Sequence, residues 1–105
     1  MKITKERTGG VMTVALEGRL DSTGALELEE ALWEDEKKQF LLSQLTELTL
    51  DFSKLEYISS AGLRVLRNLY VETKYNNFQF KITNVNEIVR EIFDVTGFSD
   101  LLTIC

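Results

Sequence analysis

Apolar and polar residues alternate with a period of two in several segments of the chain, which is the pattern of a half-buried β-strand. In segment 11–17, Met12, Val14 and Leu16 share one face, and the same alternation recurs over 48–52 and 78–83. An extended segment, 2–7, precedes them, and the pair Gly9-Gly10 lies between it and the next segment. Because glycines supply the positive backbone angles of a tight turn, we expect the chain to open with an antiparallel hairpin.

Between the predicted strands, apolar residues recur every three or four positions, which is the spacing of an amphipathic helix. Such stripes occupy 25–32 and 63–73, and a third ends near Gly97, which can adopt the left-handed conformation that closes a helix. The third stripe consists of Ile88, Val89, Ile92 and Phe93. The predicted order is strand, strand, helix, strand, helix, strand, helix, and we expect 101–105 to add an edge strand or a short helix.

Each predicted strand has one polar face, which indicates a sheet that helices cover on one side only. Strand–helix–strand units are right-handed crossovers that join parallel strands. The sequence therefore predicts an α/β fold: a four- to five-stranded mixed sheet, mostly parallel, with helices packed on one face. The connections 20–22, 53–60 and 83–86 then share one edge of the sheet, where open sheets commonly bind their ligands.

The composition fits a single globular domain over 1–105. Hydrophobic residues make up 44% and charged residues 28%, far from the composition of disordered chains. The net charge is -5 and the basic residues are dispersed, so we expect no binding to nucleic acid. A polar run follows Met1, and no apolar stretch approaches the length of a membrane span. We expect a cytoplasmic protein without membrane contact, either a monomer or a weak homodimer.

The chain has one cysteine, Cys105, and no histidine. This excludes an internal disulfide and the usual zinc ligand sets. Without an imidazole there is no Ser-His-Asp or Cys-His arrangement. The carboxylates Asp21 and Asp51 could act together in catalysis, but the sequence offers neither a nucleophile–base pair nor a phosphate-binding glycine loop beside them. We expect no enzymatic activity and neither a metal nor a cofactor.

The most informative segment is 50–63, LDFSKLEYISSAGL, which runs from a predicted strand through a loop into the second predicted helix. Ser59 or Ser60 can cap this helix by accepting a hydrogen bond from an unpaired backbone N–H group. Gly62 costs up to about 1 kcal/mol of helix propensity relative to alanine, which indicates a close approach by another group. A phosphate on either hydroxyl would lie at the positive helix end and add about 1.5 to 2 negative charges, which a docked acidic or apolar partner surface could not accept.

The run Asp51-Phe52-Ser53 and the following YISSAGL over 57–63 strongly resemble the signature of STAS-domain anti-sigma-factor antagonists. Gly18-Arg19-Leu20-Asp21 resembles the family's turn before its first helix, and 88–98 resembles its closing helix and turn. The resemblance spans the whole chain. It implies a single STAS domain and a protein-binding switch.

The resemblance implies Ser60 as the phosphorylated residue, because in the family this serine precedes a small residue and then a glycine-leucine pair. The family usually has aspartate immediately before it, whereas this chain has Ser59, which is the less favoured acceptor and the more favoured helix cap. Asp21 is a candidate cap for the first helix, with a partner contact as the alternative. Asp51 is expected to bond the backbone amides that follow it, or else to shape the acceptor loop.

The resemblance also implies a cycle of partners. The unphosphorylated protein binds an anti-sigma factor that is a serine protein kinase and thereby releases sigma factor; the kinase phosphorylates it, and a serine phosphatase restores it. The alternative is a STAS subunit or ligand-binding module that works without phosphorylation, for example as the partner of a lipid-transport ATPase. The predicted partner-binding residues are Asp21, Ser22, Tyr57, Ser59, Ser60, Ala61, Gly62, Arg64 and Arg67.

Overall fold

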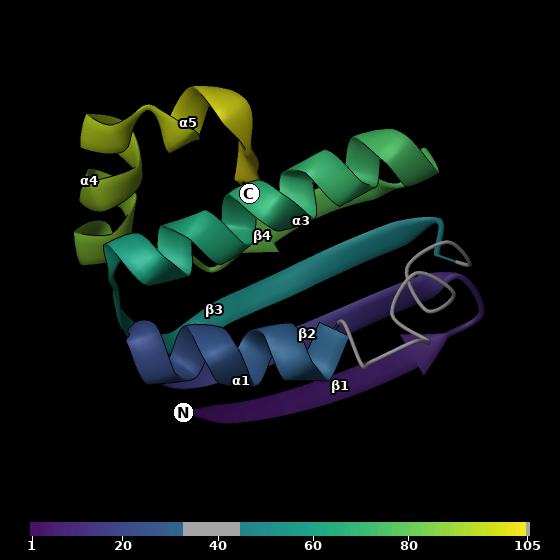
Figure 1. Ribbon diagram of the computed structural model, residues 1–105, viewed down its shortest axis with the longest axis horizontal. Helices are drawn as coiled ribbons and strands as arrows, with labels where there is room; N and C mark the ends of the chain where they lie inside the picture. Colours follow the sequence, from purple (N-terminus) through teal and green to yellow (C-terminus); the bar gives the residue numbers. More distant parts are fainter. Residues whose placement is uncertain (33–44, 105) are drawn as a thin grey trace.

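The computed structural model describes residues 1–32 and 45–104 (Figure 1). In chain order the elements are β1 (Lys2–Thr8), β2 (Val11–Leu20), α1 (Ser22–Leu32), β3 (Glu47–Ile58), α3 (Ser60–Asn76), β4 (Gln79–Thr83), α4 (Glu87–Thr96), α5 (Phe98–Leu101) and β5 (Thr103–Ile104). The predicted helices and strands are therefore present, the edge strand expected within 101–105 is β5, and the additional short helix α5 lies immediately before it. Cys105 lies outside the described residues.

The strands form one sheet in the order β1-β2-β3-β4-β5. β1 and β2 are antiparallel, and Thr8 pairs with Val11 across the hairpin. Gly9 in this turn has a φ of 61°, the left-handed conformation for which glycine is suited. All other neighbouring strands are parallel. The sheet is thus mixed and mostly parallel, as predicted.

The core lies between the sheet and the helices, with α1 and α3 running across the same side of the sheet (Figure 1). In β2 the alternate residues Met12, Val14 and Leu16 are buried against these helices. The residues between them on β2 are only half-buried. The prediction that helices pack on one face is confirmed. No helix within 1–32 or 45–104 is long and apolar enough to cross a membrane.

β3 is longer than the alternation predicted, because it continues through the segment that was expected to be a loop. Its pairing with β2 shifts register twice, and at each shift β3 carries one extra residue. Phe52, Leu55 and Ile58 are all buried although they are three residues apart. A β-bulge adds one residue to a strand and thereby switches which alternate residues face the core. The two bulges in β3 therefore allow residues three apart to be buried on the same face.

The face of α4 differs from the predicted stripe. Val89 and Phe93 are fully buried, but Ile88 is 61% exposed and does not belong to the core. Phe93 packs near Phe52 of β3, with 6.4 Å between the ring centroids. Because Val89 and Phe93 lie one turn apart, they define the buried face of α4 and leave Ile88, which precedes Val89 by one position, pointing about 100° away.

Candidate functional site

The connections that follow β2, β3 and β4 meet at the carboxyl edge of the parallel strands. The backbone N–H of Ser59 donates to the carbonyl oxygen of Leu20 at 2.9 Å, which joins the start of α3 to the end of β2. The side-chain amide of Asn86 donates to the carbonyl oxygen of Leu55 at 2.7 Å, which joins the start of α4 to β3. The prediction that these connections share one edge is confirmed.

At this edge α1, α3 and α4 each begin with a polar cap. The side-chain oxygens of Asp21, Ser59 and Asn86 accept from the backbone N–H three residues further on, at 2.9, 3.4 and 2.8 Å. The bond from the Gly24 N–H lowers the pKa of Asp21 below its ordinary value of 3.8. The predicted capping roles of Asp21 and Ser59 are confirmed. Three positive helix ends therefore lie together at one edge of the sheet.

The two adjacent serines differ in their surroundings. Ser59 is half-buried, and its hydroxyl accepts from the N–H of Gly62 and donates to the carbonyl oxygen of Leu20 at 3.3 Å. Ser60 is the first residue of α3 and is exposed. Its hydroxyl makes no hydrogen bond to any residue in the described part of the chain. Of the two hydroxyls, only that of Ser60 is open to a visiting molecule.

Gly62, one of the predicted partner-binding residues, is buried. A Cβ atom at this position would lie 2.6 Å from the carbonyl oxygen of Leu20 and 2.8 Å from Cγ1 of Ile58. The close approach that the glycine indicated therefore comes from the protein's own backbone. Gly24 of α1 repeats the arrangement, since its Cβ would lie 2.7 Å from the carbonyl oxygen of Arg19.

The remaining predicted contact residues lie around this edge. Ser22, Arg64 and Arg67 are exposed, the arginines on the outward face of α3, whereas Ala61 is half-buried. Tyr57 is half-buried at the end of β3.

Arg19 is a site residue that sequence reasoning missed. Its guanidinium carbon lies 4.6 Å from the centroid of the Tyr57 ring, a cation–π contact between β2 and β3. The register shift that brings Arg19 opposite Tyr57 could not be read from the sequence. The only feature of the sequence that pointed to Arg19 was its place in the segment Gly18-Arg19-Leu20-Asp21, which resembles a family motif.

Asp51 organises the connection after β4. Its Oδ1 accepts from the backbone N–H of Ser53 at 2.9 Å, as predicted, and from the side-chain amide of Asn84 at 3.0 Å. The Asn84 bond is the main cause, and the Ser53 N–H the next, of a pKa of Asp51 below its ordinary 3.8. Asn84 adopts a φ of 59°, which asparagine tolerates better than most residues. Asp51 therefore stabilises this edge of the sheet.

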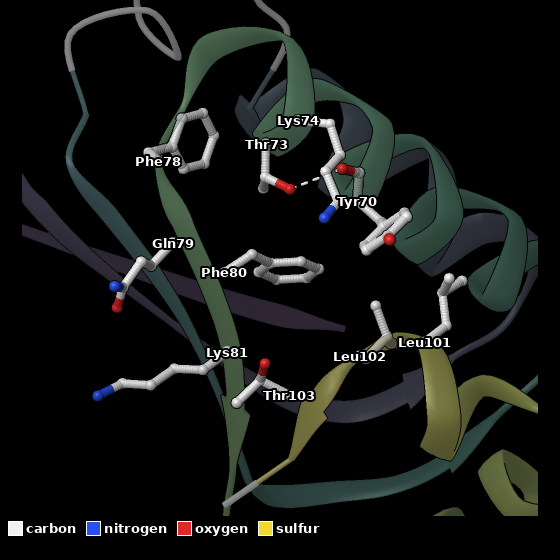
Figure 2. A pocket seen from close by; sticks show the side chains of 10 residues that line it. All are labelled: Tyr70, Thr73, Lys74, Phe78, Gln79, Phe80, Lys81, Leu101, Leu102 and Thr103. Atoms are coloured by element: carbon white, nitrogen blue, oxygen red, sulfur yellow. Dashed lines mark hydrogen bonds between the residues drawn. The ribbon is translucent and has the colours of Figure 1, made fainter.

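A shallow pocket of about 450 Å³ lies elsewhere, between the second half of α3, β4 and the chain around β5 (Figure 2). Phe80 lies between Tyr70 and Lys74 of α3 and Leu102. Tyr70 is ten residues from Ser60 along α3, about 15 Å, and the pocket shares no residue with the helix-start site. Its described lining contains no carboxylate. No group of His, Cys, Asp and Glu within the described ranges could hold a metal ion.

The fold and the site define a class: a one-sided α/β domain whose helix starts gather at one sheet edge beside an exposed serine. The chain belongs to the STAS domain family, whose model matches residues 2–105. This confirms the family that the sequence motifs indicated.

One curated relative of the chain and several similar solved structures are named as anti-sigma factor antagonists. It is 29% identical over 104 residues to "Putative anti-sigma factor antagonist BtrV" of Bordetella bronchiseptica, covering 99% of this chain and 85% of that protein. An anti-sigma factor antagonist from Mycobacterium paratuberculosis has a similar structure, with a TM-score of 0.80, 22% identity, and coverage of 98% of this chain and 83% of that one. The phosphorylated form of SpoIIAA from Bacillus gives a TM-score of 0.74 at 16% identity, covering 99% and 91%. Because their sequence identities are only 22% and 16%, the two solved structures show that the fold is shared and nothing more.

Proposed function

We propose that this chain is an anti-sigma factor antagonist switched by phosphorylation of Ser60. In this proposal the unphosphorylated form binds a serine-kinase anti-sigma factor and releases sigma factor. The kinase transfers the γ-phosphoryl group of ATP to the Ser60 hydroxyl, which loses its proton, and ADP leaves. A serine phosphatase hydrolyses the phosphate ester and restores the binding form.

The observation that carries the proposal is the difference between the two serine hydroxyls. The hydroxyl of Ser59 caps α3 and is bonded to Leu20, so its modification would break the helix start. The hydroxyl of Ser60 is exposed and without a hydrogen bond to a described residue, so a phosphate can be added without loss of a native contact. The name of the curated relative supports an anti-sigma factor antagonist, and the phosphorylated form of SpoIIAA supports a switch by phosphorylation.

The first experiment tests the acceptor. The unphosphorylated chain is used to capture an ATP-dependent serine kinase from its source cell, and the kinase is then given labelled ATP with the wild-type chain, Ser60→Ala or Ser22→Ala. Ser22 is a matched control because it is also an exposed serine at the first position of a helix at this edge. We expect Ser60→Ala to lose the label and Ser22→Ala to keep it, with mass spectrometry placing the phosphate on Ser60. Label that persists in Ser60→Ala would refute the assignment.

The second experiment tests the switch. Ser60→Glu adds negative charge at the helix start, whereas Thr8→Glu adds it at an exposed position on the opposite edge of the sheet. We expect Ser60→Glu to weaken binding to the kinase at least tenfold, and both Ser60→Ala and Thr8→Glu to bind like the wild type. Equal binding by Ser60→Glu, together with no phosphate on the wild-type chain, would instead favour a STAS module that acts without phosphorylation.

A further inference from the structure

Ser60 begins an exposed ridge along α3. Arg64 and Arg67 follow it at spacings of four and seven residues, which place all three side chains on the same outward face, and all three are exposed. Arg64 lies one turn from Ser60, about 6 Å along the helix axis, whereas Arg67 lies about 10 Å away. Only Arg64 is therefore a direct neighbour of the Ser60 side chain on this helix.

The charge along this ridge is opposite to that of the protein. The chain carries a net charge of -5, yet the first turn of α3 has no acidic residue, and the only acidic residue of the helix is Glu72. Arg64 makes no ion pair with any residue of 1–32 or 45–104. In the unmodified protein its guanidinium is thus available to an acidic group on a partner.

Two of the first four N–H groups of α3 already have partners, which leaves those of Ser60 and Ala61 as backbone donors for a phosphate on Ser60. The N–H of Gly62 is already bonded to Ser59, and Gly62 is sealed against the backbone of Leu20. The N–H of Leu63 is bonded to the carbonyl oxygen of Ser59 at 2.9 Å. An anion placed four residues before a cation on a helix has the favourable orientation for pairing. Arginine pairs with phosphate through two parallel N–H donors.

We propose that a phosphate on Ser60 binds the guanidinium of Arg64 within the same helix, and that this withdraws Arg64 from an acidic surface of the partner. The release of the partner then has two causes: the added negative charge at the helix start and the loss of a basic contact one turn further along. This inference rests on the proposed function for its biological role. The pairing itself depends only on the geometry of α3.

Arg19, near the end of β2, and Asp21, immediately before α1, are charged residues at this edge that a phosphate on Ser60 could also meet. Arg19 is engaged on the face of Tyr57, and Asp21 is engaged as the cap of α1. Arg19 is the competing cation for the phosphate and therefore needs its own variant. Arg67 serves as the matched control, because Arg67→Gln removes the same charge from the same ridge at about 10 Å along the helix axis instead of about 6 Å.

The pairing can be measured without any kinase, by installing phosphoserine at position 60 during synthesis of the full chain. The second pKa of the phosphate is then followed by phosphorus NMR in the wild-type, Arg64→Gln, Arg67→Gln and Arg19→Gln backgrounds. We expect the phosphate to have a pKa about 0.3 higher in Arg64→Gln than in the wild type, with smaller changes in the other two. Equal values in Arg64→Gln and the wild type, or a larger change in Arg19→Gln, would overturn the pairing.

The affinity for the partner is measured in a double-mutant cycle of four proteins. These are the wild type and Arg64→Gln, each with serine or phosphoserine at position 60. We expect Arg64→Gln to weaken partner binding by the unmodified chain severalfold. We also expect it to reduce the factor by which the phosphate weakens partner binding. If the phosphate weakened partner binding by the same factor in the wild type and in Arg64→Gln, repulsion alone would release the partner. That result would overturn the proposed role of Arg64. If no kinase modifies Ser60, the proposed function fails while the NMR result still decides the pairing.

Discussion

Replacing Gly62 by alanine tests how the start of α3 is held in place. Helix propensity alone predicts that Gly62→Ala stabilises the protein by up to about 1 kcal/mol. The structure predicts the opposite, because the new Cβ would lie 2.6 Å from the carbonyl oxygen of Leu20 and 2.8 Å from Cγ1 of Ile58. The carbonyl oxygen belongs to the backbone and cannot move aside as a flexible side chain would.

The magnitude follows from two costs. Overpacking a well-filled site costs about 1 to 3 kcal/mol. Moving the Leu20 carbonyl also weakens the two hydrogen bonds it accepts from Ser59, at 2.9 and 3.3 Å, each contributing about 1 kcal/mol. Set against the gain in propensity, we expect Gly62→Ala to lower the free energy of unfolding by about 1 to 3 kcal/mol.

The assay is urea unfolding, in which a domain of this size has an m-value of about 1 to 3 kcal/mol per molar urea. We expect the midpoint to fall by about 1 M with an unchanged m-value. Asn68→Ala, at an exposed position of the same helix, is the control and should be neutral or slightly stabilising. If Gly62→Ala were as stable as Asn68→Ala, the packing of α3 against β2 would not be the reason for the glycine.

Three further predictions concern stability. Ser59→Ala should lower the free energy of unfolding by about 1 kcal/mol through loss of the α3 cap. Ser60→Ala should stay within about 0.5 kcal/mol of the wild type. Equal losses of the two variants in thermal unfolding would contradict the assignment of the cap. The native contacts of Asp51 lower its pKa, so its charged form stabilises the protein above about pH 4 and this contribution is lost as the pH falls through the lowered pKa. The stability advantage of wild type over Asp51→Asn should therefore shrink on acidification from pH 7 to 3, and a constant difference would exclude this carboxylate as the cause. Phe93→Ala should cost about 3 to 5 kcal/mol, while Ile88→Ala should stay within about 0.5 kcal/mol in the same denaturant assay; comparable costs would place Ile88 in the core after all.

Local patterns determined the order of the elements. Alternation with a period of two and stripes with a period near four depend on which face of a strand or helix is buried, so the hairpin, α1 and α3 could be predicted from the chain itself. Capping likewise follows from residue type and position, which is why Asp21 and Ser59 were identified as caps.

Only the tertiary structure decided what surrounds each site residue. The bulges that carry β3 to Ile58 depend on its pairing with β2, and no residue spacing within one strand specifies a partner's register. The same register brings Arg19 over Tyr57 and the Leu20 carbonyl against Gly62. The sequence by itself marked Ser59, Ser60 and Gly62 as unusual. Contacts with Leu20, about forty positions away, decided that Ser59 is bonded inward and that Gly62 is buried against the backbone, whereas Ser60 is exposed to solvent.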